Sequence, residues 1–213
     1  MHAIPFAVFA LGLVIAGPAF GWIEYASQAD HFSINFPAEP DIREIEYQSE
    51  HSLLLPGRVY SYEDGPSRYA ITVVDFSNTE QKHAERLASC VEELGDGDSC
   101  NNPWNTERHG AIVHATWNLI QKAAEVTHFS YHFSDLVGGH QLQLTNADGS
   151  RTFAAIYMHE DRLYIMEGTV PAGYPEPGLF QQSLGFIDEN GDRIRYRSIY
   201  GNGFPPPPSF TYR

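Results

Sequence analysis

The sequence has few basic residues, and this shortage restricts which partners the protein can bind. Lys and Arg together number 13 against 27 Asp and Glu, so the formal net charge is -14 at pH 7. Such a chain repels the phosphates of nucleic acids and anionic lipid surfaces. Nucleic acid is therefore not expected among its partners. The acidic composition is interpreted first as a solubility feature, with a cationic ligand or a basic partner as the alternative.

The sequence also lacks the short motifs that carry common enzyme chemistry. It contains no G-x-S-x-G, no H-E-x-x-H and no phosphate-binding glycine loop. No catalytic residue, cofactor-binding residue or cofactor is therefore predicted. A small periplasmic hydrolase whose site is assembled from distant residues stays open as an alternative.

The amino-terminal residues, MHAIPFAVFALGLVIAGPAFG, contain no Asp, Glu, Lys or Arg. The apolar run over residues 4–15 and the small residues that follow are typical of a secretory leader. We expect a signal peptide over residues 1–21, cleavage after Gly21 and a periplasmic or secreted protein. Because the uncharged stretch continues to Ile23, an uncleaved membrane anchor is the alternative, and only in that case is contact with a membrane expected.

Cysteine is scarcer still, since Cys90 and Cys100 are the only two in the chain. In an exported protein, two thiols at this separation are expected to form a disulfide with each other. Closing so short a loop stabilises a fold by about 2–3 kcal/mol. A redox-active pair is the alternative, but catalytic dithiols usually lie two residues apart.

The first half of the remaining chain predicts strands and then helices. Short runs with strand composition, bounded by Pro, Gly and Asp, cover residues 31–37, 41–49, 57–64 and 68–77. Two later stretches have apolar residues at helical spacing and predict helices that bury those residues. The first begins at Thr79 and the second covers residues 109–125. The apolar positions are Ala84, Leu87, Val91 and Leu94 in the first and Val113, Trp117, Ile120 and Ala124 in the second.

Residues 125–169 alternate between apolar and polar and predict a four-stranded antiparallel meander. The expected register places Phe133 opposite Leu142, which keeps aromatic and leucine side chains on one face. The strand RTFAAIYM is apolar on both faces, which indicates a sheet covered on both sides. With a last helix predicted in residues 176–187, the expected fold is α+β: an antiparallel sheet with helices on both faces, an α/β/α sandwich.

Domain boundaries follow from the same patterns. One domain is expected over residues 22–187, followed by a charged strand or arm and a proline-rich tail over residues 188–213. Prolines at 205–208 and neighbouring aromatic residues are typical of a segment that docks on a protein partner or larger assembly. The alternative is that the arm wraps its own acidic domain or is disordered.

Histidines at helical spacing raise the question of a metal site. His128 and His132 lie four residues apart, but in a strand they are separated by about 13 Å and cannot bind one ion as a pair. His109 and His114 are the other candidates. No metal ligand is predicted, and an exposed polar surface is the preferred interpretation of all four.

The segment DENGDR over residues 188–193 matches only the beginning of a calcium loop. Arg193 stands where glycine is required, and Ile199 stands where the bidentate glutamate is required. An ordinary polar turn is therefore expected.

The run HFSINFPAEP, followed by a hairpin, a helix, a meander and a last helix, resembles the PsbP-like and Mog-type fold over residues 31–187. The runs DGSR, HEDRLYIMEG and LFQQSLGF are similar to those of small exported bacterial proteins. The PsbP-like resemblance implies an α/β/α sandwich and a non-catalytic accessory role in which the protein binds a larger complex. The disulfide loop and the proline-rich tail depart from that pattern, so no interface is carried over. We expect an exported, non-enzymatic accessory or binding module, with a hydrolase or a metal-binding protein as alternatives.

Overall fold

The computed structural model describes residues 21–95, 100–201 and 209–212. Predictions for the leader and for the prolines of the tail lie outside the described residues. The elements are, in chain order, β1 Ile23–Ser27, β2 Phe32–Phe36, β3 Asp41–Gln48, β4 Leu54–Asp64, β5 Ser67–Asp75, α1 Thr79–Leu94, α2 Trp104–Ile120, β6 Glu125–Ser134, β7 Val137–Thr145, β8 Arg151–His159, β9 Arg162–Val170, α3 Gly178–Gln181, β10 Gly185–Phe186, β11 Arg193–Tyr196 and β12 Ser209–Tyr212.

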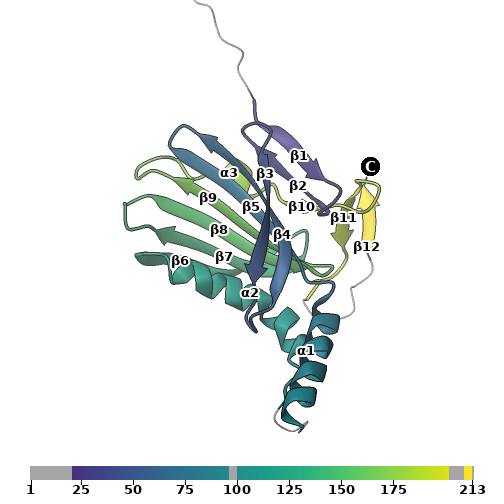
Figure 1. Cartoon of the computed structure of the whole chain (residues 1–213). Coiled ribbons are helices and arrows are strands. Elements are labelled where there is room, and N and C mark those ends of the chain that lie inside the picture. Colours follow the sequence, from purple (N-terminus) through teal and green to yellow (C-terminus); the bar gives the residue numbers. More distant parts are fainter. Residues whose placement is uncertain (1–20, 96–99, 202–208, 213) are drawn as a thin grey trace, which may run out of the picture.

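A seven-stranded sheet in the order β3-β4-β5-β9-β8-β7-β6 forms the centre of the molecule (Figure 1), and every neighbouring pair in it is antiparallel. Its edge strands are β3 and β6. The strand predictions for residues 31–77 are confirmed to within a few residues, and so is the four-stranded meander. The two groups of strands meet at the pairing of β5 with β9.

Helix α2 covers one face of this sheet. Its inward residues pack on alternate residues of β7, β8 and β9, which form a continuous apolar layer. The inward residues of α2 include Ala111, Ile112, Ala115 and Leu119, and the sheet contributes Leu142, Leu144, Ala154, Ile156, Leu163 and Ile165. Small alanine side chains let the helix lie close to the strands.

The second face is covered by the small sheet β1-β2-β10, by the one-turn helix α3 and by β11 (Figure 1). Its core is largely aromatic. The fully or almost fully buried rings are Phe32, Phe36, Tyr60, Tyr157, Tyr164, Phe180 and Phe186. Neighbouring rings meet edge to face, as between Phe32 and Tyr60, whose centroids are 5.0 Å apart.

The predicted α/β/α sandwich is therefore wrong, because α2 covers one face of the large sheet and a second sheet, with the one-turn α3, covers the other. Strand β8 is buried along almost its whole length, as its apolar sequence predicted. Hydrophobic periodicity shows that a face is covered but does not show which kind of element covers it. The helix predicted in residues 176–187 shrinks to four residues, because Gly185 and Phe186 pair with β2 instead.

Both long helices form where predicted, but they bury other faces than expected. In α1 the buried residues are Thr79 and His83, whereas Val91 and Leu94 are exposed. In α2 the exposed residues include Val113 and Trp117, since the alanine-containing stripe faces the sheet instead. Most of the residues predicted to be buried in the two helices thus remain on the surface, whereas Ile120 packs against the core.

The predicted register of the meander is also wrong. Phe133 lies opposite Gly138, and Phe129 is the residue opposite Leu142. The turn between β6 and β7 takes only two residues, Asp135 and Leu136, with φ values of 47° and 67°. Such left-handed pairs form the tight turns that match strand twist. The glycines expected to break the chain therefore lie inside β7.

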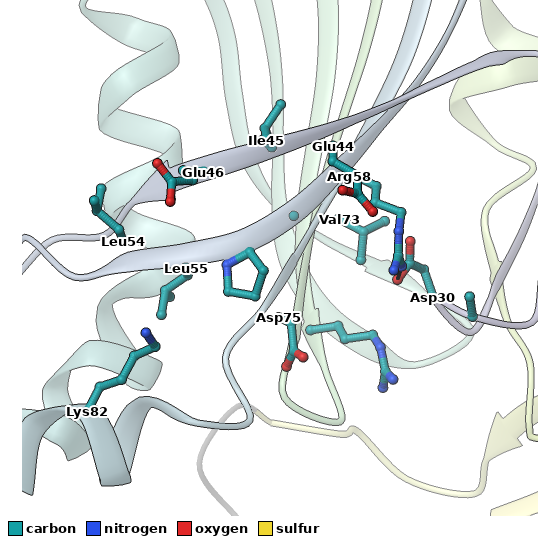
Figure 2. A pocket seen from close by; sticks show the side chains of 14 residues that line it. Asp30, Glu44, Ile45, Glu46, Leu54, Leu55, Arg58, Val73, Asp75 and Lys82 are labelled. Carbon is teal, nitrogen blue, oxygen red and sulfur yellow. Dashed lines mark hydrogen bonds and ion pairs between the residues drawn. The ribbon is translucent and has the colours of Figure 1, made fainter.

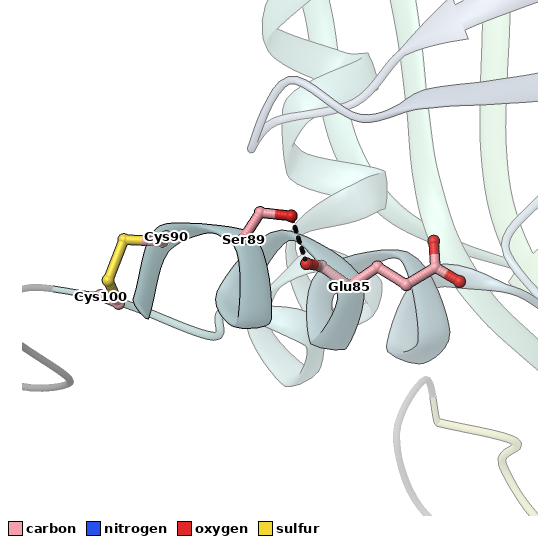
Figure 3. Close-up of a disulfide and its surroundings, with 4 residues drawn as sticks. All are labelled: Glu85, Ser89, Cys90 and Cys100. Atoms are coloured by element: carbon pink, nitrogen blue, oxygen red, sulfur yellow. Dashed lines mark hydrogen bonds between the residues drawn. A yellow bond between two sulfur atoms is a disulfide. The ribbon is translucent and has the colours of Figure 1, made fainter. Parts of the chain in front are cut away.

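The predicted disulfide is confirmed: Cys90 in α1 is bonded to Cys100, just before α2 (Figure 3). Helix α1 ends nearby at Gly95, which has a φ of 67° and donates its N–H to the Val91 carbonyl at 2.8 Å. The disulfide is consistent with an exported protein. None of the helices in the described part of the chain is long and apolar enough to cross a membrane.

Residues that follow the predicted domain end also pack on the core. Ile194, Tyr196 and Tyr200 belong to the aromatic core. Arg193 donates to the Asp135 carboxylate at 2.8 Å. The described part of the predicted arm therefore lies against its own domain.

Candidate functional site

A cavity of about 650 Å³ lies where β4 begins and β5 ends (Figure 2). Its walls come from β3, β4, β5, the start of β9, helix α1 and the turn between β1 and β2. The apolar part of the lining consists of Ala29, Ile45, Leu54, Leu55, Pro56 and Val73. The charged side chains of the lining are Asp30, Glu44, Glu46, Arg58, Asp75, Lys82 and Arg162.

Asp30, in the turn after β1, has the most hydrogen bonds of these charged residues. It is 7% exposed, and its two carboxylate oxygens accept from Arg58 Nη1 at 2.7 Å and from the Tyr60 hydroxyl at 2.5 Å. Its backbone carbonyl accepts from the Tyr164 hydroxyl at 2.9 Å, and its N–H donates to Ser27 Oγ. A buried carboxylate is stable only when its oxygens are paired in this way.

This network holds the Arg58 guanidinium at the cavity wall. The hydrogen bond and the charge of Asp30 raise the pKa of Arg58, so the guanidinium stays charged. Burial and the bond to Asp30 raise the pKa of Tyr60 to about 12, so its hydroxyl keeps the proton that it donates. Figure 2 shows Arg58 directed at Asp30, on the side of the cavity away from Lys82.

The other charged residues of the cavity are less constrained. Within the described part of the chain, no ion pair joins Lys82 or Arg162 to an acidic side chain. Asp75 is the register partner of Arg162 across β5 and β9, so the two side chains lie on the same face of the sheet. The cavity therefore offers three cations, with the carboxylates of Glu44, Glu46 and Asp75 also in its walls.

The lining of the cavity combines charged and apolar side chains. The described residues around the cavity include no serine, cysteine or histidine. A nucleophile and a neighbouring base are needed for the usual acyl-transfer chemistry. What the cavity supplies is a set of charged hydrogen-bonding groups beside an apolar wall, which is typical of a ligand pocket.

The four histidines considered as metal ligands do not form one site. His128 and His132 lie on β6, where His128 Nε2 is 3.0 Å from Ser130 Oγ and His132 Nδ1 is 2.8 Å from the Tyr157 hydroxyl. Burial lowers the pKa of His132. His109 and His114 lie on α2, where His114 Nε2 accepts from the Asn118 amide at 3.1 Å. Across residues 21–95, 100–201 and 209–212, no three His, Cys, Asp or Glu side chains come close enough to hold a metal ion.

The segment over residues 188–193 forms the expected polar turn. The Asp188 carboxylate accepts from the backbone N–H groups of Asn190 and Asp192 at 2.8 and 3.0 Å. Both bonds go to Asp188 Oδ1, so this side chain holds the turn together.

Two buried histidines were not singled out by the sequence. His83 Nε2 lies 2.7 Å from Glu107 Oε2 between α1 and α2. His159 stacks on Phe186 at 4.3 Å and lies 2.6 Å from the Tyr196 hydroxyl. Neither lines the cavity, so we assign both a structural role.

The charged cavity was likewise missed at the sequence level. Asp30 comes from the turn after β1, and Arg58, Lys82 and Arg162 come from β4, α1 and β9, so no spacing in the sequence connects them. Sheet topology is what brings them together, and sequence patterns do not reveal it.

No protein-family model and no curated protein matches this chain. The resemblance to the PsbP-like family therefore stays a prediction.

Proposed function

We propose that this chain is an exported, non-enzymatic binding protein that holds a small zwitterionic ligand in the charged cavity. One observation carries the proposal. Arg58 is fixed by the buried Asp30, while Lys82 and Arg162 line the same cavity without an ion-pair partner in the described residues. Three of only 13 basic residues thus gather in one cavity of a chain with a net charge of -14.

The lining indicates the chemical class of the ligand. Arginine and lysine side chains recognise carboxylate or phosphate, and a pre-positioned guanidinium does so with little loss of entropy. Glu44, Glu46 and Asp75 supply acceptors for an ammonium group in the same space. The volume lies within the range of small-molecule pockets, about 300–1,000 Å³. An amino acid or a short peptide with free termini combines both charges at this size.

Melting temperatures measured with three probes test the proposal. The probes are glycylglycine, inorganic phosphate and putrescine, which carry both charges, negative charge and positive charge respectively. We expect glycylglycine at millimolar concentration to raise the melting temperature more than the other two, because a ligand that binds only the folded state stabilises it. Equal or absent shifts with all three probes would contradict the proposal.

Variants of two cavity residues test whether glycylglycine raises the melting temperature by binding in the cavity. Lys82→Ala combined with Arg162→Ala should abolish the glycylglycine shift with little change in the melting temperature of the unliganded protein, since neither side chain forms an ion pair within the described residues. Lys122→Ala is the matched control, because Lys122 is exposed and does not line the cavity. A shift that survives the double substitution would place the binding elsewhere.

Export and partner binding belong to the same proposal. We infer cleavage after Gly21 and a periplasmic or secreted location, supported by the Cys90–Cys100 disulfide. Intact mass spectrometry of the exported chain checks both, since the mass should begin at Trp22 and be lower by two hydrogens. Docking of the tail on a protein partner is tested by deleting residues 202–213. This deletion spares Tyr196 and Tyr200, which belong to the core.

A further inference from the structure

The two edges of the large sheet differ in how they are protected. Edge strand β3 carries Asp41, Arg43, Glu44 and Glu46 among its eight residues. Edge strand β6 carries one charged residue, Glu125, among ten. Charged side chains are a usual means of preventing an edge strand from pairing with another chain. Strand β6 has no such protection from Val126 to Ser134.

Strand β6 also exposes apolar side chains along this unprotected stretch. Phe129, Tyr131 and Phe133 share one face and are 51%, 61% and 37% exposed. The Tyr131 and Phe133 rings pack edge to face with their centroids 5.0 Å apart. Within the described residues, β6 pairs with β7 and with no other strand. Its outer hydrogen-bonding groups are therefore available.

Helix α2 extends the same apolar surface. Thr116 Oγ1 lies 2.8 Å from His140 Nδ1, and the His140 ring lies 5.1 Å from the Phe129 ring. This side of α2 therefore faces the inner surface of β6. Val113 and Trp117 lie one turn apart beside Thr116 and are 60% and 57% exposed. We call the five residues Phe129, Tyr131, Phe133, Val113 and Trp117 the aromatic edge.

A contiguous apolar surface of this kind marks an interaction site on a soluble protein. Four rings with a total area of about 150–250 Å² each, roughly half exposed, offer about 400 Å² on one chain. Two such surfaces, together with the backbone of two added strands, approach the area that stable interfaces bury, about 1,200–2,000 Å².

We propose that a second copy of this chain covers the aromatic edge by antiparallel pairing of β6 with its own counterpart across a two-fold axis. The apolar area of the edge and its open strand favour this occupant. Two copies with a net charge of -14 each repel one another over most of their surface, but β6 brings no carboxylate to the contact between residues 126 and 134, so this edge is where two copies can approach. With a two-fold axis, the same patch on each copy covers the exposed β6 edge of the other, so the hydrogen-bonding groups of both edges are paired in one contact.

The register follows from the side chains. With Tyr131 on the axis, Phe129 lies opposite Phe133 of the second copy, and Ser130 lies opposite His132. Every residue of the aromatic face then meets another aromatic residue, and Glu125 falls outside the paired stretch. Burial lowers the pKa of His132 and of His140 behind the edge, which keeps both rings neutral at neutral pH. This interface leaves the charged cavity open, because the cavity is lined by the opposite edge of the sheet.

Sedimentation analysis of the exported chain tests the proposal. We expect a mass twice that of one chain at micromolar concentration. Tyr131→Lys places two like charges on the axis and should shift the protein to a folded monomer. Its melting temperature should no longer depend on protein concentration, whereas that of the native dimer should rise with concentration. Ile42→Lys is the matched control, because Ile42 is 54% exposed on the other edge strand, and this variant should remain dimeric.

Cysteine substitution tests the register. The Cα atoms of directly opposed residues in antiparallel strands lie about 4.5–5.5 Å apart, which suits a disulfide. Tyr131→Cys should therefore form a disulfide-linked dimer on mild oxidation, whereas Ile42→Cys should not. A native protein that stays monomeric up to submillimolar concentration would overturn the proposal. A dimer that Tyr131→Lys leaves intact would also overturn it, because the contact would then lie elsewhere.

Discussion

His83 of α1 and Glu107 of α2 form a hydrogen bond of 2.7 Å between side chains that are both completely buried. The second carboxylate oxygen of Glu107 accepts from the backbone N–H of His51 at 3.5 Å. Among the described residues His83 is one of only two buried side chains of α1. This contact therefore joins α1 to α2 and, through His51, to the loop before β4.

Removing one partner of this buried pair should destabilise the fold strongly, because the other partner is left unpaired away from water. We expect Glu107→Ala or His83→Ala to lower the free energy of unfolding by about 3–5 kcal/mol, measured by urea denaturation. Glu85→Ala, on the exposed side of α1, is the control and should change it by less than about 0.5 kcal/mol. An effect of Glu107→Ala as small as that of the control would contradict this account.

Stability should fall in mild acid because of His159. Burial lowers the pKa of this side chain to about 3, and it is 0% exposed. The unfolded chain, with a histidine pKa near 6.5, binds the proton more readily. The stabilisation that the folded protein gains from keeping His159 neutral is therefore fully present above about pH 6.5 and is lost as the pH falls toward 3. Between pH 7 and pH 5 the free energy of unfolding should fall by about 2 kcal/mol for this reason.

The corresponding measurement compares urea denaturation at pH 7 and pH 5 in the native protein and in His159→Phe. The variant keeps a ring beside Phe186 but cannot titrate, so its loss of stability between the two pH values should be smaller by about 2 kcal/mol. Equal losses in the two proteins would assign the acid sensitivity to other groups.

Reducing the disulfide should affect the end of α1 more than the sheet. Val91 and Leu94 are exposed, so the last turns of α1 have little packing to replace the bond. We expect Cys90→Ser with Cys100→Ser to cost about 2–3 kcal/mol at most. Hydrogen exchange should accelerate in residues 88–95 and stay unchanged in β8. Faster exchange across the whole sheet would show that the bond supports the core instead.

Gly139 should not accept a side chain. A Cβ atom there would collide with the backbone carbonyl oxygen of Ile156 and with the Tyr157 ring. Gly139→Ala should therefore lower the free energy of unfolding by about 1–3 kcal/mol, as overpacked core positions do. Gly178→Ala is the control, because a Cβ at that position has no atom within 4 Å. Similar melting temperatures for the two variants would disprove the close approach of β7 to β8.

Strand positions were predictable because alternation and turn residues are local features, and β3 and β5 lie within two residues of their expected bounds. The small sheet that covers the second face of the large sheet could not be predicted. The residues of β1 gave no strand pattern strong enough to be recognised, and the run around Phe180 had helical spacing although most of it is not helical. Pairing with β2 outweighed that local preference, because Phe186 is completely buried there.

The buried faces of the helices and the position of the cavity show a further limit of prediction from the sequence. Val113 and Trp117 are more apolar than Ala111 and Ala115, so hydrophobicity selected the wrong side of α2. The helix lies close to the sheet, and this close approach favoured the small residues on the buried side. Hydrophobicity alone does not predict such a preference. The cavity depends on Asp30 and Arg58 meeting across 28 positions of sequence. A contact of that kind is determined by topology and not by local pattern.

The pairing of β5 with β9 at the centre of the large sheet also shapes how the chain can fold. The register joins Arg68 to Thr169, so this central ladder must wait until about 100 later residues have been synthesised or exported. Until then β5, with Ile71, Val73 and Val74, presents an unpaired apolar edge. Such long-range closure slows folding and exposes the intermediate to aggregation. We therefore expect the chain to need protection by a holding chaperone until its last strands arrive.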